Sequence, residues 1–168
     1  MTRDDRRAPR PEAEGSGDLN RGSHAMTAQQ LAEACAKAMW ADDQACRDLG
    51  MCILRVAPGE AELSMPVEAR MVNGHGICHG GYIFTLADSA FAYACNSFNR
   101  RAVAQSNSIT YLRPARLGDM LTARGTQTQA AGRSGITDVT VFDQEGRVIA
   151  VFRGLSRSIE GHLVEVSP

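Results

Sequence analysis

Apolar residues recur with a helical period in the middle of the chain. Between Tyr82 and Asn96 they fall three or four positions apart, at Ile83, Leu86, Ala87, Ala90, Phe91 and Ala94. At about 100° per residue, the apolar arc also takes in Phe84, Ala92, Tyr93 and Cys95, which leaves only a narrow polar strip. A helix that is apolar on nearly every side belongs in a protein core, so we expect the rest of the chain to pack around it.

One carboxylate interrupts this apolar arc. Asp88 projects between Phe84, Ala92 and Cys95 rather than from the polar strip of the helix. Burying an isolated carboxylate is unfavourable unless it is paired or its pKa rises. Asp88 is therefore either a structural acid with a satisfied partner or a functional group.

A loop rich in glycine and histidine precedes the helix. The segment NGHGICHGG, residues 73–81, has no apolar period. Glycine has no Cβ, so a ligand can approach the free N–H groups at the start of the helix, where the helix dipole is positive. The segment predicts a helix N-terminus that is open to a polar or negatively charged ligand.

The pattern on either side of the central helix predicts helices first and strands later. We expect helices over 28–40 and 42–49, a hairpin of strands over 51–56 and 61–66, and later strands over 102–113, 119–131, 135–142 and 147–158. Turn residues separate the four later strands, which favours a meander. Because strands and helices do not alternate, the sheet should be antiparallel. The pattern predicts an α+β protein in which five or six strands wrap around one long central helix.

The two ends of the chain differ in composition from its centre. Residues 1–26 are mostly Arg, Asp, Glu, Pro, Gly and Ser, so burial cannot offset the entropy of ordering them and we expect a disordered tail. The sequence GSHAM at 22–26 resembles a cloning scar, so this tail could be derived from a tag. We therefore divide the chain into this tail, one domain over 27–160 and a C-terminal tail over 161–168.

Composition and charge narrow the class of partner. A chain of 168 residues with 43% hydrophobic content suits one globular domain with a core. The net charge is -1 and no run of Lys and Arg is present, so nothing favours nucleic acid. No apolar run is long enough to span a membrane, and no signal-peptide pattern is present. We expect a cytoplasmic protein with neither nucleic-acid nor membrane partners.

The cysteines and histidines do not form a metal or disulfide pattern. The five cysteines are scattered and include no CxxC pair, so we interpret them as reduced thiols. His75 and His79 lack a third ligand at a suitable spacing, so we expect no metal. Cys78 adjoins His79, but sequence neighbours rarely align for proton transfer, which disfavours a Cys-His nucleophile.

Three motifs together resemble one known family. They are NGHGICHGGYIFTLADSAFAYACNS over 73–97, ITYLRPARLGD over 109–119 and VFRGLSRSI over 151–159. The stretch from 28 to 160 resembles the hotdog-fold thioesterases, and within them the phenylacetic-acid-degradation (PaaI) type. The resemblance implies a hotdog fold and hydrolysis of acyl-CoA thioesters, of the phenylacetyl-CoA or hydroxyphenylacetyl-CoA type. It also implies a homotetramer built from two dimers and no cofactor, since coenzyme A is part of the substrate.

The resemblance also assigns roles to four residues. It implies that Asp88 is the catalytic carboxylate and that Gly80 supplies a backbone N–H to the thioester carbonyl. Asn73 and His79 match loop positions that orient water or the substrate. A further polar position in the following strand is matched only loosely by Gln105 and Ser106, so we assign no role to either.

Three further residues are candidates for binding the substrate. They are Gly81 and His75 in the loop and Arg113, which with Arg116 and Arg133 could meet the phosphates of coenzyme A. Each has an ordinary alternative, since loop histidines hydrogen-bond the backbone and single surface arginines are often solvated. Asn73 could likewise only cap a turn.

The spacing of the two main groups predicts a shared site. Thioester hydrolysis places negative charge on the carbonyl oxygen, which free N–H groups at a helix N-terminus can stabilise. Asp88 lies eight residues beyond Gly80, about 12 Å along one helix, so both cannot reach one carbonyl. We therefore expect a two-fold homodimer with antiparallel helices, in which each N-terminus meets the middle of the partner's helix.

Two other functions remain open at this point. A hotdog enoyl-CoA hydratase or dehydratase would use a loop histidine and a helix acid, which His79 and Asp88 could provide. A non-catalytic acyl-CoA sensor would need an output domain, and the N-terminal tail is too short and polar for a helix-turn-helix. Hydration of crotonyl-CoA, or binding without turnover, would identify these alternatives.

Overall fold

The computed structural model describes residues 26–165. Its elements are α1 (Ala28–Asp42), α2 (Gln44–Asp48), β1 (Cys52–Ala57), β2 (Glu60–Pro66), the short 3-10 helix η1 (Ala69–Met71), α3 (Gly80–Asn96), β3 (Ala102–Tyr111), β4 (Met120–Ala131), β5 (Ser134–Phe142) and β6 (Val148–Ser158). Every helix and strand expected from the pattern is present, with ends that differ by at most two residues. The disordered tail expected over residues 1–26 lies outside the described residues except for Met26, and residues 166–168 lie outside them as well.

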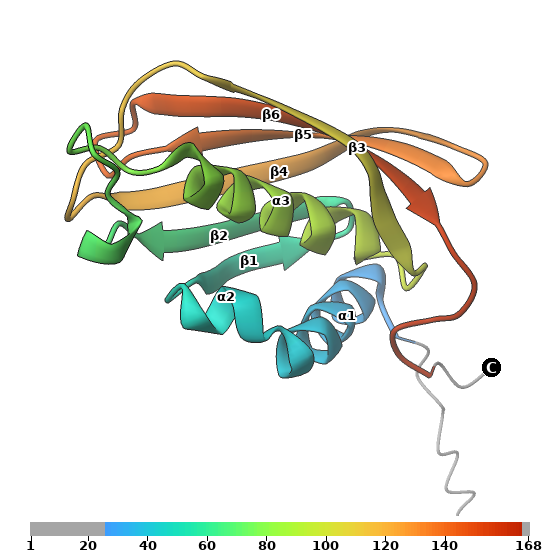
Figure 1. Cartoon of the computed structure of the whole chain (residues 1–168). Coiled ribbons are helices and arrows are strands. Elements are labelled where there is room, and N and C mark those ends of the chain that lie inside the picture. The colour runs from blue at the N-terminus through green and yellow to red at the C-terminus, as the bar shows by residue number, and fades with distance from the viewer. Residues whose placement is uncertain (1–25, 166–168) are drawn as a thin grey trace, which may run out of the picture.

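The six strands form one antiparallel sheet around α3. The strand order is β1-β2-β4-β5-β6-β3, and each neighbouring pair is antiparallel. α3 lies along one face of this curved sheet, and α1 and α2 lie below it beside β1 (Figure 1). This arrangement confirms the predicted α+β hotdog fold with a long central helix.

The predicted meander of four strands is wrong in one place. β4, β5 and β6 are consecutive neighbours, but β3 pairs with β6 at the far edge and β4 pairs with β2. The connector over 112–119 crosses to the start of α3, where Cys78 N–H donates to the carbonyl of the fully buried Ala115 at 2.8 Å. Local turn residues suit a crossover as well as a hairpin, so alternation alone could not identify the partner of β3.

Small residues let α3 lie close to the sheet. Leu86, Ala87, Ala90 and Ala94 are all 0% exposed and face the core. On β4, a Cβ built at Gly125 would lie 3.1 Å from the carbonyl oxygen of Ala90. Glycine at that position therefore permits the close approach of helix and strand.

The N-terminal helices cover the side of α3 that the sheet leaves open. Thr27 caps α1 in a reciprocal capping box with Gln30. Trp40 packs on Tyr93 of α3 with ring centroids 6.3 Å apart, and the Tyr93 hydroxyl donates to Asp43 at 3.1 Å. α1 and α2 are thus part of the same core as the sheet.

No helix in the described part of the chain combines the length and the apolar character needed to cross a membrane.

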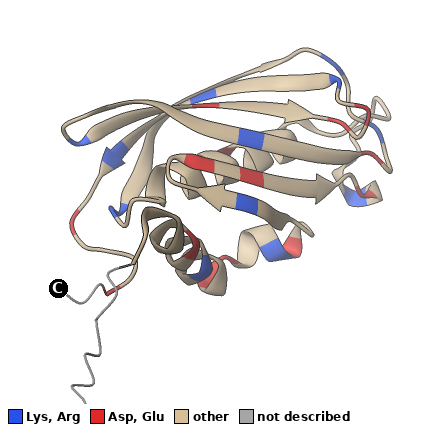
Figure 2. Ribbon diagram, turned by 180° about the vertical axis from the view of Figure 1, so that it is seen from behind, with Lys and Arg blue, Asp and Glu red and all other residues tan. Residues whose placement is uncertain are grey.

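Charged residues of both signs lie along the strands on the outer face of the sheet, where Figure 2 colours them blue and red. Arg124 pairs with Glu62 across β4 and β2, and Arg153 pairs with Asp138 across β6 and β5. Thr126 is exposed on the same face, as the alternation along β4 predicts. The opposite face of the sheet packs against α3.

Candidate active site

The N-terminus of α3 is built by His79 and two glycines. His79 is the N-cap, and its Nδ1 accepts a hydrogen bond from the Gly81 N–H at 3.0 Å. The helix therefore begins at Gly80, two residues before the start expected from the apolar period. Because its N–H is taken by His79, Gly81 is not a free donor for a substrate.

The N–H of Gly80 is free. Within residues 26–165 no group accepts a hydrogen bond from it, whereas the carbonyl of the same residue accepts one from the Tyr111 hydroxyl at 2.8 Å. Tyr111 and His79 thus hold the Gly80–Gly81 peptide from its two sides. The result is one fixed N–H donor at the positive end of a 17-residue helix.

The position of Tyr111 explains why residue 80 is glycine. A Cβ built at Gly80 would lie 2.8 Å from Cζ and 2.9 Å from the hydroxyl oxygen of Tyr111. Any other residue would displace this ring, which is about half exposed on the edge strand β3. Glycine therefore provides access to the backbone and space for Tyr111.

Asp88 is partly buried in the middle of α3, as the sequence predicts. Burial raises the pKa of its carboxyl above the ordinary value, and a hydrogen bond from Asn107 opposes the rise. That bond joins Asn107 Nδ2 to Asp88 Oδ1 at 2.7 Å. The other carboxylate oxygen has no partner among the described residues, so it is available for chemistry.

The sequence pattern does not identify Asn107, because the polar residues that it offers at this place in the strand are the neighbouring Gln105 and Ser106. A β-bulge between Ala104 and Ser106 inserts Gln105 as an extra residue in β3. Beyond the bulge the alternation is reversed, so Asn107 faces α3. Asn107 lies four positions before Tyr111, so the two side chains share one face of the strand, but only the structure shows that this face is turned toward α3.

A cavity of about 560 Å³ adjoins the Gly80 end of the helix. Asn73, Gly80, Tyr111 and Arg113 line it together with apolar side chains, but Asp88 does not. The structure thus separates the two main candidates, because Gly80 and Asp88 lie about 12 Å apart along one continuous helix.

Other residues of the loop before α3 make hydrogen bonds within the loop itself. The Oδ1 of Asn73 accepts from the His75 N–H at 2.9 Å, which closes a turn and leaves Nδ2 of Asn73 for the cavity. His75 is exposed on this turn and does not line the cavity. The buried Cys78 has a raised pKa and donates its thiol to the His79 carbonyl, so this neighbouring pair is not arranged as a nucleophile and base.

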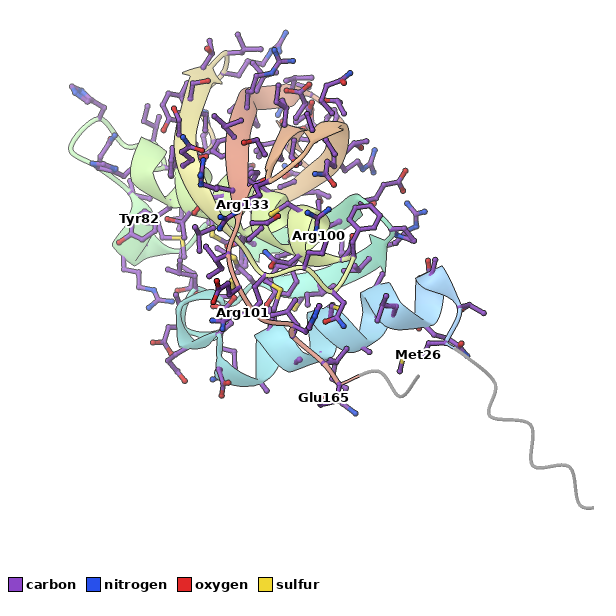
Figure 3. The ribbon with its side chains drawn as sticks, turned by 90° about the vertical axis from the view of Figure 1, so that its right-hand side faces the viewer. Met26, Tyr82, Arg100, Arg101, Arg133 and Glu165 are labelled. Atoms are coloured by element: carbon purple, nitrogen blue, oxygen red, sulfur yellow. The ribbon has the colours of Figure 1, made fainter. Side chains whose placement is uncertain are left out.

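Arginines lie near two different cavities. Arg113 lines the cavity at the Gly80 end and donates to the Val148 carbonyl at 2.8 Å. At the other end of α3, a cavity of about 310 Å³ is lined by Cys95, Gln127 and Arg100. Arg100 donates to Gly132, the residue before Arg133, and both arginines lie where the C-terminal segment leaves the sheet (Figure 3).

Comparisons with known proteins agree on one family. A model of the thioesterase superfamily matches residues 75–150. The acyl-coenzyme A thioesterase PaaI of Escherichia coli is 43% identical over 126 residues, which cover 75% of this chain and 90% of that protein. The structure of the Escherichia coli PaaI protein matches with a TM-score of 0.80 and 40% identity, covering 81% of this chain and 99% of that one. A protein from Streptococcus mutans bound to acetyl CoA matches with a TM-score of 0.65 and 28% identity, covering 67% of this chain and 90% of that one.

Proposed function

This chain belongs to the thioesterase superfamily as an acyl-CoA thioesterase of PaaI type, and we propose that it hydrolyses arylacetyl thioesters. The substrates would be of the phenylacetyl-CoA or hydroxyphenylacetyl-CoA type, and the products the free acid and coenzyme A. The observation that carries this proposal is that the same helix presents two groups suited to thioester hydrolysis. These are the Gly80 N–H, which has no acceptor among the described residues, and the partly buried carboxylate of Asp88.

The Gly80 N–H is the proposed oxyanion donor. As the thioester carbonyl is attacked, negative charge develops on its oxygen, and a preorganised N–H at a helix N-terminus stabilises that charge. His79 and Tyr111 hold the adjoining peptide, so the donor need not reorganise during the reaction. Asn73 adds an amide Nδ2 on the same cavity, where it can orient the substrate.

Asp88 acts in this proposal as the base or the nucleophile. As a base it takes a proton from water while the water oxygen bonds to the carbonyl carbon. The C–S bond then breaks, the thiolate of coenzyme A leaves and takes up the proton, and the free acid remains. As a nucleophile the carboxylate would itself attack the carbonyl carbon, the C–S bond would break, and the thiolate of coenzyme A would leave and take up a proton from water. A water molecule would then cleave the resulting anhydride, which releases the free acid and restores the Asp88 carboxylate.

The site needs two chains. Gly80 and Asp88 of one helix are about 12 Å apart, so the donor and the acid that serve one carbonyl come from different subunits. β3 is an edge strand whose outer hydrogen-bonding groups have no neighbouring strand in the described part of the chain, and it carries the exposed apolar side chains of Val103 and Tyr111. An antiparallel pairing of two copies along this edge would place the helices side by side. We propose this homodimer, and a homotetramer formed from two such dimers.

The two cavities would then serve different parts of the substrate. In an antiparallel helix pair, the Gly80 end of one chain lies near Asp88 of its partner, and the partner's helix continues toward Cys95. The apolar cavity beside Gly80, with Tyr111 and Arg113 on its wall, suits the arylacetyl group. The partner's cavity near Cys95, with Arg100 and Arg133 at its edge, suits the phosphate-bearing arm of coenzyme A.

The geometry gives less support to the hydratase alternative. Because Nδ1 of His79 accepts the Gly81 N–H, the neutral ring carries its proton on Nε2. A proton shuttle through this histidine would need to break the cap at the N-terminus of α3. In hydrolysis His79 can remain in the cap throughout.

The test is a substrate survey with the purified full chain. Release of free thiol would be followed with phenylacetyl-CoA, hydroxyphenylacetyl-CoA, acetyl-CoA and a long-chain acyl-CoA, alongside hydration of crotonyl-CoA. We expect kcat/KM for the arylacetyl esters to exceed that for acetyl-CoA by about tenfold or more, since an aryl group adds buried apolar area. Preference for a long-chain ester would contradict the substrate assignment, and hydration of crotonyl-CoA or binding without turnover would contradict hydrolysis.

A further inference from the structure

Asn107 is bound to Asp88 by only one of its two polar atoms. Its Nδ2 donates to the carboxylate at 2.7 Å, while its Oδ1 is buried and has no hydrogen-bond partner within residues 26–165. Among the described residues, only the hydroxyl of Thr137 shares this condition of a buried polar side-chain atom without a partner. Buried acceptors are nearly always satisfied in folded proteins, so an exception calls for a reason.

The surrounding backbone is shaped to accommodate this side chain. Asn107 is paired with Gly154 of β6, and a Cβ at Gly154 would lie 3.0 Å from Asn107 Oδ1 and 2.5 Å from the ring of Phe91. Glycine there leaves room for the amide between α3 and the sheet. The β-bulge at Gln105 turns Asn107 toward the helix.

The orientation of the amide follows from the charge of its partner. With Nδ2 toward Asp88, the amide donates to the carboxylate and leaves Oδ1 against Gly154. With the amide reversed, its oxygen would face the carboxylate oxygen and repel it. The side chain therefore leaves an acceptor unsatisfied in order to supply a donor to an ionised Asp88.

We propose that Asn107 is a positioning residue for the reaction: it holds Asp88 Oδ1, so that Oδ2 points toward the substrate and the carboxylate stays ionised. This role rests on the function proposed for Asp88. It differs from a structural role because a nonpolar side chain of similar size would satisfy the packing better than asparagine does.

The ionisation of Asp88 supplies a readout for this role. Burial raises the pKa of Asp88 and the Asn107 bond lowers it, so removal of the donor should raise that pKa further. The other titratable groups coupled to Asp88 are the thiols of Cys46 on α2 and Cys95 on α3. Burial raises the pKa of each to about 12, so both remain neutral over the range of an assay.

The experiment compares Asn107→Leu with Thr137→Val. Each removes a buried unpartnered polar atom at nearly constant volume, but only the first touches Asp88. We expect Asn107→Leu to lower kcat about tenfold at neutral pH with little change in KM. It should also move the acid limb of the pH–rate profile to higher pH. At neutral pH its melting temperature should fall, because the partly buried Asp88 carboxylate loses its donor, and the difference from the wild type should shrink at low pH, where Asp88 is protonated. Thr137→Val should keep or raise the melting temperature, with kcat and the pH profile unchanged.

A second variant controls for a steric effect of leucine. Asn107→Ala removes the same donor without adding bulk, and it should give the same upward shift of the acid limb. A pH profile like that of the wild type in both Asn107 variants would overturn the proposal. So would a loss of melting temperature with unchanged kcat, which would indicate a structural role. These results differ from a failure of the proposed function, in which Asp88→Asn itself would remain active.

Discussion

The two ends of α3 differ in how they use their polar groups. At the C-terminal end, Asn96 is buried and its amide donates to the Ala92 and Ala102 carbonyls and accepts from the Ala102 N–H. Nearby, the hydroxyl of Ser97 donates to the Ala94 carbonyl and accepts from the Gly59 N–H. The buried polar side chains at this end are thus hydrogen-bonded, and they hold the fold together.

Asn99 completes that end of the helix. It adopts a φ of 57°, and its Oδ1 accepts from the backbone N–H groups of Leu163 and Val164 at 2.9 and 3.0 Å. Its Nδ2 donates to the Val164 carbonyl at 2.9 Å. One side chain therefore attaches the segment after β6 to the end of α3.

The N-terminal half of α3 is organised in the opposite way. Among residues 26–165, no group bonds to the Gly80 N–H, to one carboxylate oxygen of Asp88 or to Oδ1 of the Asn107 that supports it. These groups lower stability and provide interactions for a substrate. At the two ends of α3, therefore, polar groups with hydrogen-bond partners stabilise the fold, and polar groups without partners belong to the candidate site.

The largest expected effect is the loss of activity in Asp88→Asn. The change keeps the size of the side chain and removes the base or nucleophile, so turnover should fall about a hundredfold or more. Steady-state assays of thiol release measure this. A variant with the turnover of the wild type would show that Asp88 is not the catalytic carboxylate.

The same variant should not lose stability. Because burial raises the pKa of Asp88, its contribution to stability is fully present below the unfolded pKa and is lost as pH rises through the folded pKa. At neutral pH the ionised carboxylate therefore lowers stability, and an amide at this position should leave the melting temperature equal or higher. Thermal unfolding of both proteins at pH 7 checks this sign.

Asn99→Ala should show the reverse pattern, a loss of stability with normal turnover. The side chain loses its hydrogen bonds to the 163–164 backbone, and alanine is strained at positive φ, so we expect a loss of about 2 kcal/mol in the free energy of unfolding. Denaturant unfolding gives this value. Asn99→Gly is the control, since it tolerates the backbone conformation and should lose less. A lower kcat in fully folded Asn99→Ala would contradict the view that the C-terminal end of α3 contributes to stability and not to turnover.

A smaller effect is expected for Tyr111→Phe. It removes the hydroxyl that holds the Gly80 carbonyl, so the donor should be less well placed and kcat should fall by up to about tenfold with KM little changed. Tyr82→Phe is a matched control in the first turn of α3, because its hydroxyl makes only a long 3.5 Å contact with the Arg70 carbonyl. Equal kcat values in the two variants would mean that Tyr111 has no part in placing the donor.

Local pattern predicted the elements, but not the pairing of β3. Helices and strands follow from the spacing of apolar residues, which is a property of neighbours in sequence. The partner of β3 depends on the path of the connector over 112–119, whose buried Ala115 joins the loop before α3. That contact is distant in sequence, so no period reveals it.

The same distinction applies to the candidate site. Asp88 could be predicted because it interrupts an apolar arc on a single helix. Asn107 could not, because the bulge at Gln105 reverses the alternation of β3. The role of Tyr111 was also missed, since it depends on a contact with Gly80 across 31 positions of the chain.

The most direct test of the two-chain site mixes two inactive proteins, Asp88→Asn and Gly80→Pro. Proline suits the first turn of a helix and removes the N–H donor, and the half-exposed ring of Tyr111 can swing outward to make room for it. Each heterodimer would contain one site with both lesions and one with neither. We predict that refolding the two variants together recovers activity at up to about half of the sites in each heterodimer. Confirmed heterodimers that stay as inactive as either parent would contradict a site shared between two chains.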